Sequence, residues 1–382
     1  MKSIICRDSI KPLFLASFLF FCTTGIVSSH FIAICMILII SMAKGRGLRI
    51  TTPFQIIIII VALSFLNEII HILIEGGAPS FLEIIPYSIF IFITMWAAQI
   101  VDERVLRWMM WFTLIDIGAA VIQRVIGVNT FLPENMTDAA EMGGELLYDL
   151  KVNGLNTNSS GLAYKAFLAL LIHERFPKCR LFGNYIWYII CLAGIVLAFN
   201  RTMLLAFLVY FSFKLLRDRK KGILIPLVVL ICFLVLSLPD VMEFIITQLT
   251  RGNDSFSAGN ATSGREEIYA HYINFCKEHF FFGNGSFKYY MGEGIHAHNS
   301  FLQTMATNGF IITALYVLFL LSTIKKTTWI YALPIFVCAL TQSFILWGAS
   351  YNDFVFYCIM LKPVTDIIQE HQDLKTNKYC IV

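Results

Sequence analysis

The chain has 382 residues, of which 58% are hydrophobic and only 14% are charged, and its formal net charge is +4. A water-soluble protein of this length would carry far more charge, so the composition excludes an ordinary soluble enzyme. Long apolar runs and a mean hydropathy of +0.72 instead predict an all-α integral membrane protein. Membrane topology accounts for the excess of positive charge, and we expect no nucleic-acid partner.

A helix needs about 20 mostly apolar residues to cross a bilayer. By this measure the sequence predicts about twelve spans, near residues 12–26, 28–43, 53–74, 82–100, 106–127, 157–173, 184–199, 202–216, 222–238, 299–323, 328–347 and 353–368. The last span is weak, because Asp353 and Lys362 flank a short apolar core. The N-terminal segment is interpreted as an uncleaved first helix, because a second span follows it at once.

The distribution of basic residues predicts an orientation for these spans. With the N-terminus in the cytoplasm, most of the 29 Lys and Arg residues fall on the cytoplasmic side, as the positive-inside rule requires. Both chain ends are then cytoplasmic. The chain divides into spans one to nine (1–238), a large outer loop (239–298) and spans ten to twelve (299–382).

The large outer loop is expected to contain a helix of its own. Ser263, followed three residues later by Glu266, forms a capping-box pattern, and apolar positions recur after it at helical spacing. We predict a helix over about 264–281, ended by Gly283-Asn284-Gly285. Arg265 then lies in the first turn, where free N–H groups already favour anions. This pattern indicates a phosphate-binding site.

Two histidines and an amide stand where this loop meets the tenth span, in the segment His296-Ala297-His298-Asn299. Imidazole accepts a proton near neutral pH, so His298 is a candidate general base for a hydroxyl group. An interfacial histidine that caps the helix is an equally good interpretation. The His-x-His pair is a weak indication of zinc, since no Cys or carboxylate ligand stands nearby, and we predict no metal.

Arg201 lies in the tight outer turn between the seventh and eighth predicted spans, where a cation departs from the positive-inside rule. One interpretation is an arginine that snorkels to lipid phosphate. The other is a substrate-binding arginine, because the planar guanidinium donates two hydrogen bonds to a phosphate at once. Arg201, Arg265 and His298 share one side of the membrane in the predicted topology, which favours a functional role.

Ionisable residues inside the predicted spans occupy costly positions; they are Glu68, His71, Asp116, Arg124 and Lys165. Glu68 and His71 are one turn apart and can pair, whereas Asp116 and Arg124 are too far apart along their helix. Pairing inside the bundle is the favoured interpretation for most of them. Arg124 and Lys165 lie toward the outer leaflet, where they are candidates to line a cavity for an anionic substrate.

Several segments resemble the O-antigen ligase/polymerase superfamily of bacteria. They are Asn200-Arg201-Thr202, Thr262-Ser263-Gly264-Arg265-Glu266-Glu267-Ile268-Tyr269, Phe282-Gly283-Asn284-Gly285-Ser286-Phe287 and His298-Asn299-Ser300-Phe301-Leu302-Gln303 with Gly309. The similar stretch covers about residues 195–325, and the spacing from His298 to Gly309 fits the family. The ligase version usually has a small residue three positions after that glycine. Ile312 stands there in this chain, which favours a polymerase.

The resemblance implies an inverting, metal-independent membrane glycosyltransferase of the C type, with no cofactor. Its donor would be an oligosaccharide on undecaprenyl pyrophosphate, at the periplasmic face of the bacterial inner membrane. A polymerase extends a lipid-linked repeat unit, whereas a ligase transfers the glycan to the lipid A core. Membrane lipid and a chain-length regulator protein are further candidate partners.

The resemblance also implies roles for individual residues. Arg201 and Arg265 would bind the pyrophosphate and stabilise it as the leaving group, because fixed positive charge favours the negative charge that develops there. His298 would act as the base on the acceptor hydroxyl or orient it. Further candidate substrate-binding residues are Asn299, His296, Lys165 and Arg124.

A flippase or transporter for lipid-linked oligosaccharide is the alternative from a different class. A flippase requires charged groups along a path through both leaflets. The main candidate site residues, Arg201, Arg265 and His298, instead lie on one side of the predicted membrane. This distribution favours an enzyme, and the family pattern favours a polymerase ahead of a ligase.

Overall fold

The computed structural model describes residues 7–24, 30–42, 50–75, 85–133, 151–217, 265–292 and 294–363. Within these residues the protein is helical and contains no strand beyond one isolated bridge. The helices are α1 (Arg7–Cys22), α2 (His30–Met42), α3 (Thr52–Glu75), α4 (Tyr87–Ile100), α5 (Glu103–Ile126), α7 (Ser159–Arg175), η3 (Pro177–Cys179), α8 (Asn184–Leu197), α9 (Arg201–Arg217), α13 (Arg265–Glu278), α14 (Ser300–Thr323), α15 (Trp329–Thr341) and α16 (Tyr351–Leu361).

Each predicted span that falls on described residues coincides with a helix, which confirms the all-α prediction. The span near 222–238 and the first part of the large outer loop, residues 239–264, lie outside the described residues. Among the described helices, α3, α5 and α14 are long and apolar enough to cross a membrane, and α1, α2, α4, α8 and α15 are apolar but shorter. The count of twelve spans therefore stays a prediction.

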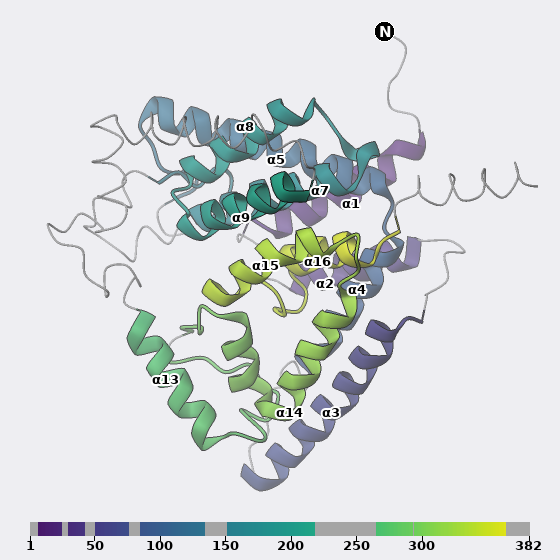
Figure 1. Ribbon diagram of the computed structural model, residues 1–382, viewed down its shortest axis with the longest axis vertical. Coiled ribbons are helices and arrows are strands. Elements are labelled where there is room, and N and C mark those ends of the chain that lie inside the picture. Colours follow the sequence, from purple (N-terminus) through teal and green to yellow (C-terminus); the bar gives the residue numbers. More distant parts are fainter. Residues whose placement is uncertain are drawn as a thin grey trace, which may run out of the picture.

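The helices pack in pairs that bring distant parts of the sequence together. α14 packs against α3 and α13, α15 packs against α9, and α16 packs against α4 and α7. In Figure 1, α15 and α16 lie between the α7–α9 layer and the group formed by α13, α14 and α3. α7 and α16 are buried on almost every side, which places them in the interior of the bundle. Large apolar side chains of α3, α5 and α8, such as Leu73, Val125 and Ile189, are exposed, as for helices that face lipid.

The helix predicted over 328–347 is shorter in the structure. α15 ends at Thr341, and Gln342 has an extended backbone. Residues 342–350, which we call the α15–α16 loop, contain no helical turn. Irregular backbone in apolar surroundings is tolerated only where the protein itself bonds its polar groups. The end of the helix at Thr341 therefore depends on side chains that form hydrogen bonds with the backbone of the α15–α16 loop.

Two buried side chains from outside α15 supply these bonds. Ser300, at the start of α14, accepts from two loop N–H groups at 2.9 and 3.2 Å. Asp353, in α16, accepts from two more at 2.7 and 2.8 Å. The four donors are Phe344, Ile345, Leu346 and Trp347. The α15–α16 loop is thus bonded between the start of α14 and the start of α16.

α13 confirms the helix predicted in the outer loop, although it ends at Glu278 rather than at Phe281. Ser263 of the predicted capping box lies outside the described residues. The glycine-bearing turn that follows α13 rests on α14, where Asn284 N donates to Ala306 O at 2.8 Å. At this contact α14 is kinked by Gly309, which has φ 76 and ψ 180. A side chain at Gly309 would overlap the backbone of Phe281.

Candidate functional site

His298 lies immediately before α14 with a φ of 48, a left-handed conformation that few non-glycine residues adopt. Its Nδ1 lies 3.4 Å from Oε1 of Gln342, the first residue of the α15–α16 loop. An amide oxygen can only accept a hydrogen bond, so this contact favours the tautomer that is protonated on Nδ1 and keeps the lone pair of Nε2. This tautomer leaves Nε2 able to accept a proton.

The surroundings of His298 favour its neutral form. Burial lowers the pKa of His298 below the usual 6.5, and the positive charge of Arg265 lowers it further, while the bond to Gln342 acts in the opposite direction. A neutral imidazole is the form that a general base requires. The geometry and the electrostatics of His298 therefore both suit proton acceptance.

His296 lies beside His298, with ring centroids 4.1 Å apart. Burial lowers the pKa of His296 to about 4, with further contributions from the charges of His298, Lys288 and Arg265. Within the described residues, no third Cys, His or carboxylate joins the two rings to form a metal-type cluster. His296 is consequently a neutral neighbour of His298, and its ring also contacts Trp347 at 5.5 Å between centroids.

Arg265 begins α13, and its Nη1 donates to the carbonyl oxygen of Thr341 at 2.6 Å. That carbonyl belongs to the last turn of α15, where no intrahelical donor is available. The guanidinium group carries five N–H donors, so several remain for another ligand. Its positive charge lowers the pKa of both His296 and His298.

Arg201 begins α9 and is half-buried. Asn200 caps this helix, because its Oδ1 accepts from Met203 N at 3.0 Å. The Met203 sulfur lies 3.9 Å from the sulfur of Cys338 in the last turn of α15. The start of α9 therefore lies beside the end of α15 that holds Arg265 and His298. The fold brings these three predicted residues to one end of the helix bundle.

Both polar groups of the Asn299 side chain form hydrogen bonds within the protein. Its Oδ1 caps α14 by accepting from Phe301 N and Leu302 N, both at 3.0 Å. Its Nδ2 donates to Leu340 O at 3.0 Å, which ties the start of α14 to the end of α15. Asn299 therefore holds the backbone that carries His298.

Lys165 and Arg124, the candidate cations inside the predicted spans, have different surroundings. Lys165 is 2% exposed, forms an ion pair with Asp116 at 3.5 Å and donates to Asn156 at 2.6 Å. Arg124 is exposed near the end of α5. These contacts agree with the structural interpretation of Lys165. Neither carboxylate oxygen of Glu68 has a hydrogen-bond partner within the described residues, so the predicted pair with His71 is not hydrogen-bonded.

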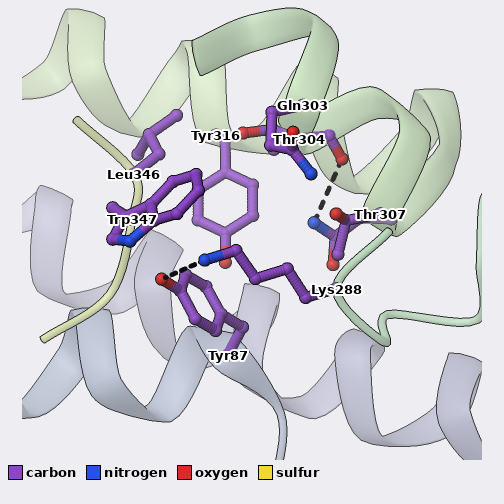
Figure 2. Close-up of a pocket in the computed structure, with 9 residues that line it drawn as sticks. Tyr87, Lys288, Gln303, Thr304, Thr307, Tyr316, Leu346 and Trp347 are labelled. Carbon is purple, nitrogen blue, oxygen red and sulfur yellow. Dashed lines mark hydrogen bonds between the residues drawn. The ribbon is translucent and has the colours of Figure 1, made fainter. Parts of the chain in front are cut away.

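A small pocket that sequence reasoning missed lies next to His296. Its lining comes from α4, α14, the segment before α14 and the α15–α16 loop, and comprises Tyr87, Lys288, Gln303, Thr304, Thr307, Asn308, Tyr316, Leu346 and Trp347. Figure 2 shows the ammonium group of Lys288 between the rings of Trp347 and Tyr87. Lys288 is a cation in the predicted outer loop, and that departure from the positive-inside rule is the signal that could have identified it.

Comparison with protein families gives one match. Residues 186–317 match a family model described as O-antigen ligase. The matched segment covers about a third of the chain, runs from α8 into α14, and includes Arg201, Arg265 and His298. No curated protein matches the sequence significantly. The match confirms the resemblance that the motifs predicted, and both of its ends lie within about ten residues of the predicted stretch 195–325.

Proposed function

We propose that this chain, whose residues 186–317 carry the O-antigen ligase family domain, is an O-antigen polymerase of the bacterial inner membrane. It transfers a glycan from undecaprenyl pyrophosphate to a lipid-linked repeat unit at the periplasmic face. Arg265 and His298, bonded to adjacent residues at the end of α15, carry this proposal. Glycosyl transfer from a pyrophosphate to a hydroxyl requires a phosphate-binding cation and a neutral base close to each other.

In the proposed reaction, the acceptor hydroxyl attacks the anomeric carbon of the donor sugar on the face opposite the pyrophosphate. The new C–O bond forms as the bond to the pyrophosphate oxygen breaks, and the electron pair of that bond leaves with the pyrophosphate. His298 Nε2 takes the proton of the hydroxyl. Arg265 and Arg201 stabilise the negative charge on the leaving group, so the proposed reaction needs no metal.

The acceptor distinguishes a polymerase from a ligase. Ile312 is 5% exposed inside the bundle, at the position where the ligase version usually has a small residue, and this supports the polymerase. The decisive experiment deletes the gene and compares the lipopolysaccharide on a gel. A single repeat unit on the core supports the polymerase. Bare core with accumulated lipid-linked polymer would assign a ligase, and bare core without that polymer would assign a flippase.

Complementation of the deletion strain tests the site itself. We expect the wild-type gene to restore long-chain glycan and the His298→Ala variant to restore none, although it reaches the membrane in normal amounts. His279→Ala, which changes an exposed histidine just after α13, is the matched control and should restore long-chain glycan. Normal chain length with His298→Ala would rule out a general base at this position.

A further inference from the structure

Lys288 is a half-buried cation that forms no ion pair within the part of the chain that the structure describes. Its Nζ lies 3.0 Å from the ring centroid of Trp347 and 5.0 Å from that of Tyr87. It also donates a long hydrogen bond of 3.5 Å to the Tyr87 hydroxyl. Aromatic faces stabilise an ammonium group only in part, so the site is suited to a further, negatively charged ligand.

Asp353 is the nearby acid, but its carboxylate is already bonded. It accepts from Leu346 N, Trp347 N and the Ser350 hydroxyl at 2.7 to 2.8 Å. Asp353 therefore acts on Lys288 only from a distance. Burial lowers the pKa of Lys288 to about 7, while the charge of Asp353 acts in the opposite direction. An anion bound at Lys288 would offset the cost of burying its charge.

The remaining lining of the pocket has the chemistry of a sugar subsite. Aromatic rings of Trp347, Tyr87 and Tyr316 can cover an apolar C–H face, and a few fixed polar groups would set the orientation of a ligand. The Thr307 hydroxyl accepts from Tyr289 N at 3.4 Å, which leaves its hydrogen free to donate. The Thr304 hydroxyl donates to Ser300 O at 2.7 Å, which leaves its lone pairs free to accept.

The charge of the pocket selects the type of anion. Lys288 is the only cation among its lining residues, so a single negative charge is matched and a pyrophosphate is not. The pocket is small, and a carboxylate with the edge of its sugar ring suits it better than a longer glycan. Its Trp347 ring contacts His296, whose ring lies against His298. The pocket is therefore adjacent to the candidate transfer site.

We propose that this pocket binds the carboxylate of an acidic sugar in the transferred glycan or its acceptor. Lys288 is the ion partner of the carboxylate, and Trp347 is the surface on which the sugar ring rests. The substrate class is then a repeat unit that contains a uronic acid or a related acidic sugar. This inference rests on the proposed function, because it takes the pocket to be a subsite of the glycosyl-transfer site.

Binding can be measured apart from catalysis with the purified full-length protein in detergent. The probes are the methyl glycosides of glucuronic and galacturonic acid, their neutral glucose and galactose counterparts, and inorganic pyrophosphate, each titrated by calorimetry. We expect at least one uronide to bind saturably and about tenfold more tightly than its neutral counterpart, as a charge-assisted contact provides. Lys288→Met should remove this preference. Lys277→Met, which changes an exposed lysine of α13, should leave it intact.

Three results would overturn the inference: no saturable binding of either uronide, equal affinity for the uronide and its neutral counterpart, or an unchanged preference in Lys288→Met. A loss of pyrophosphate affinity alone in Lys288→Met would assign Lys288 to the phosphate site instead. Lys288→Gln replaces Lys288→Met if the latter does not fold. His298→Ala should keep the uronide preference while it abolishes polymer formation, so a failure of the proposed function is distinguishable from a failure of this inference.

Discussion

Arg265 and His298 are bonded to consecutive residues of the chain: Arg265 Nη1 to the carbonyl of Thr341, and His298 Nδ1 to the side chain of Gln342. The backbone turns from helix to extended chain at this point. The end of α15 thus sets the position of both side chains at once. A change that displaces this turn should disturb both residues together, whereas a change in either side chain should act separately.

Arg265→Lys keeps the positive charge but loses the planar fork that can hold two phosphate oxygens. We expect the rate of polymer formation in membrane vesicles to fall about 100-fold, the size expected when one donor to a developing negative charge is lost. Arg107→Lys, which changes an exposed arginine of α5 on the predicted cytoplasmic side, is the matched control and should retain full activity. Near-wild-type activity of Arg265→Lys would argue against bidentate phosphate binding.

The acid side of the pH–activity profile should report the titration of His298. Only the neutral imidazole accepts a proton, and the pKa of His298 is lowered by burial and by Arg265. Activity should therefore persist at the usual histidine pKa of 6.5 and fall only as the pH drops through the lowered pKa. Arg265→Met removes a positive charge, raises the pKa of His298 and should move the acid limb of the residual activity to higher pH. An acid limb that stays in place would exclude His298 as the titrating base.

Gly309 should tolerate no side chain. Its φ of 76 is costly for other residues, and a Cβ would overlap the backbone at Phe281. We expect Gly309→Ala to destabilise the protein by about 3 kcal/mol or more, measured as thermal unfolding in detergent. Within the described residues, no neighbouring atom lies within 4 Å of the position that a methyl group on Gly118 of α5 would occupy, so Gly118→Ala should be neutral or stabilising. Equal effects of the two changes would contradict this explanation of the kink.

Ser300→Ala tests the α15–α16 loop. The Ser300 hydroxyl accepts from Phe344 N and Ile345 N and donates to Gln342 O at 3.2 Å. Its loss leaves buried backbone groups unbonded, at a cost of about 1–3 kcal/mol, and releases the residue that holds His298. We expect both the melting temperature and the rate to fall. Ser322→Ala, which removes only a bond to Phe319 O of the same helix, should change neither. A lower melting temperature with an unchanged rate would separate the loop from catalysis.

Local sequence patterns predicted the helices well, because an apolar run of sufficient length favours the same structure wherever its neighbours lie. The early end of α15 was not predictable in this way. Residues 344–347 resume the apolar pattern of the helix before them. The loop forms there because Ser300 and Asp353, distant in sequence, bond its N–H groups. Tertiary contacts overrode the local preference.

In the candidate site, too, local patterns predict some residues, whereas the roles of others depend on tertiary contacts. His298, Arg265 and Arg201 could be selected from their residue types and their places at the ends of predicted helices. Gln342 could not, because it lies inside a predicted span and gains its role only through the turn at Thr341. Lys165 is a candidate substrate contact by position, and the structure adds an ion pair with Asp116 of α5 and a bond to Asn156, just before α7. A sequence pattern along one helix does not predict ion pairs between two helices.

Metal independence of the proposed transfer has its own test. The two rings of His296 and His298 lie 4.1 Å apart and are the nearest approach to a metal site among the described residues of this region, but zinc sites in enzymes usually have three protein ligands. In the proposed reaction, Arg201 and Arg265 rather than a metal stabilise the negative charge on the leaving group. We therefore expect full polymer formation in membrane vesicles with excess chelator. Activity that chelator abolishes and zinc restores would make the two histidines ligands. The His296→Ala variant would then lose its bound zinc together with its activity.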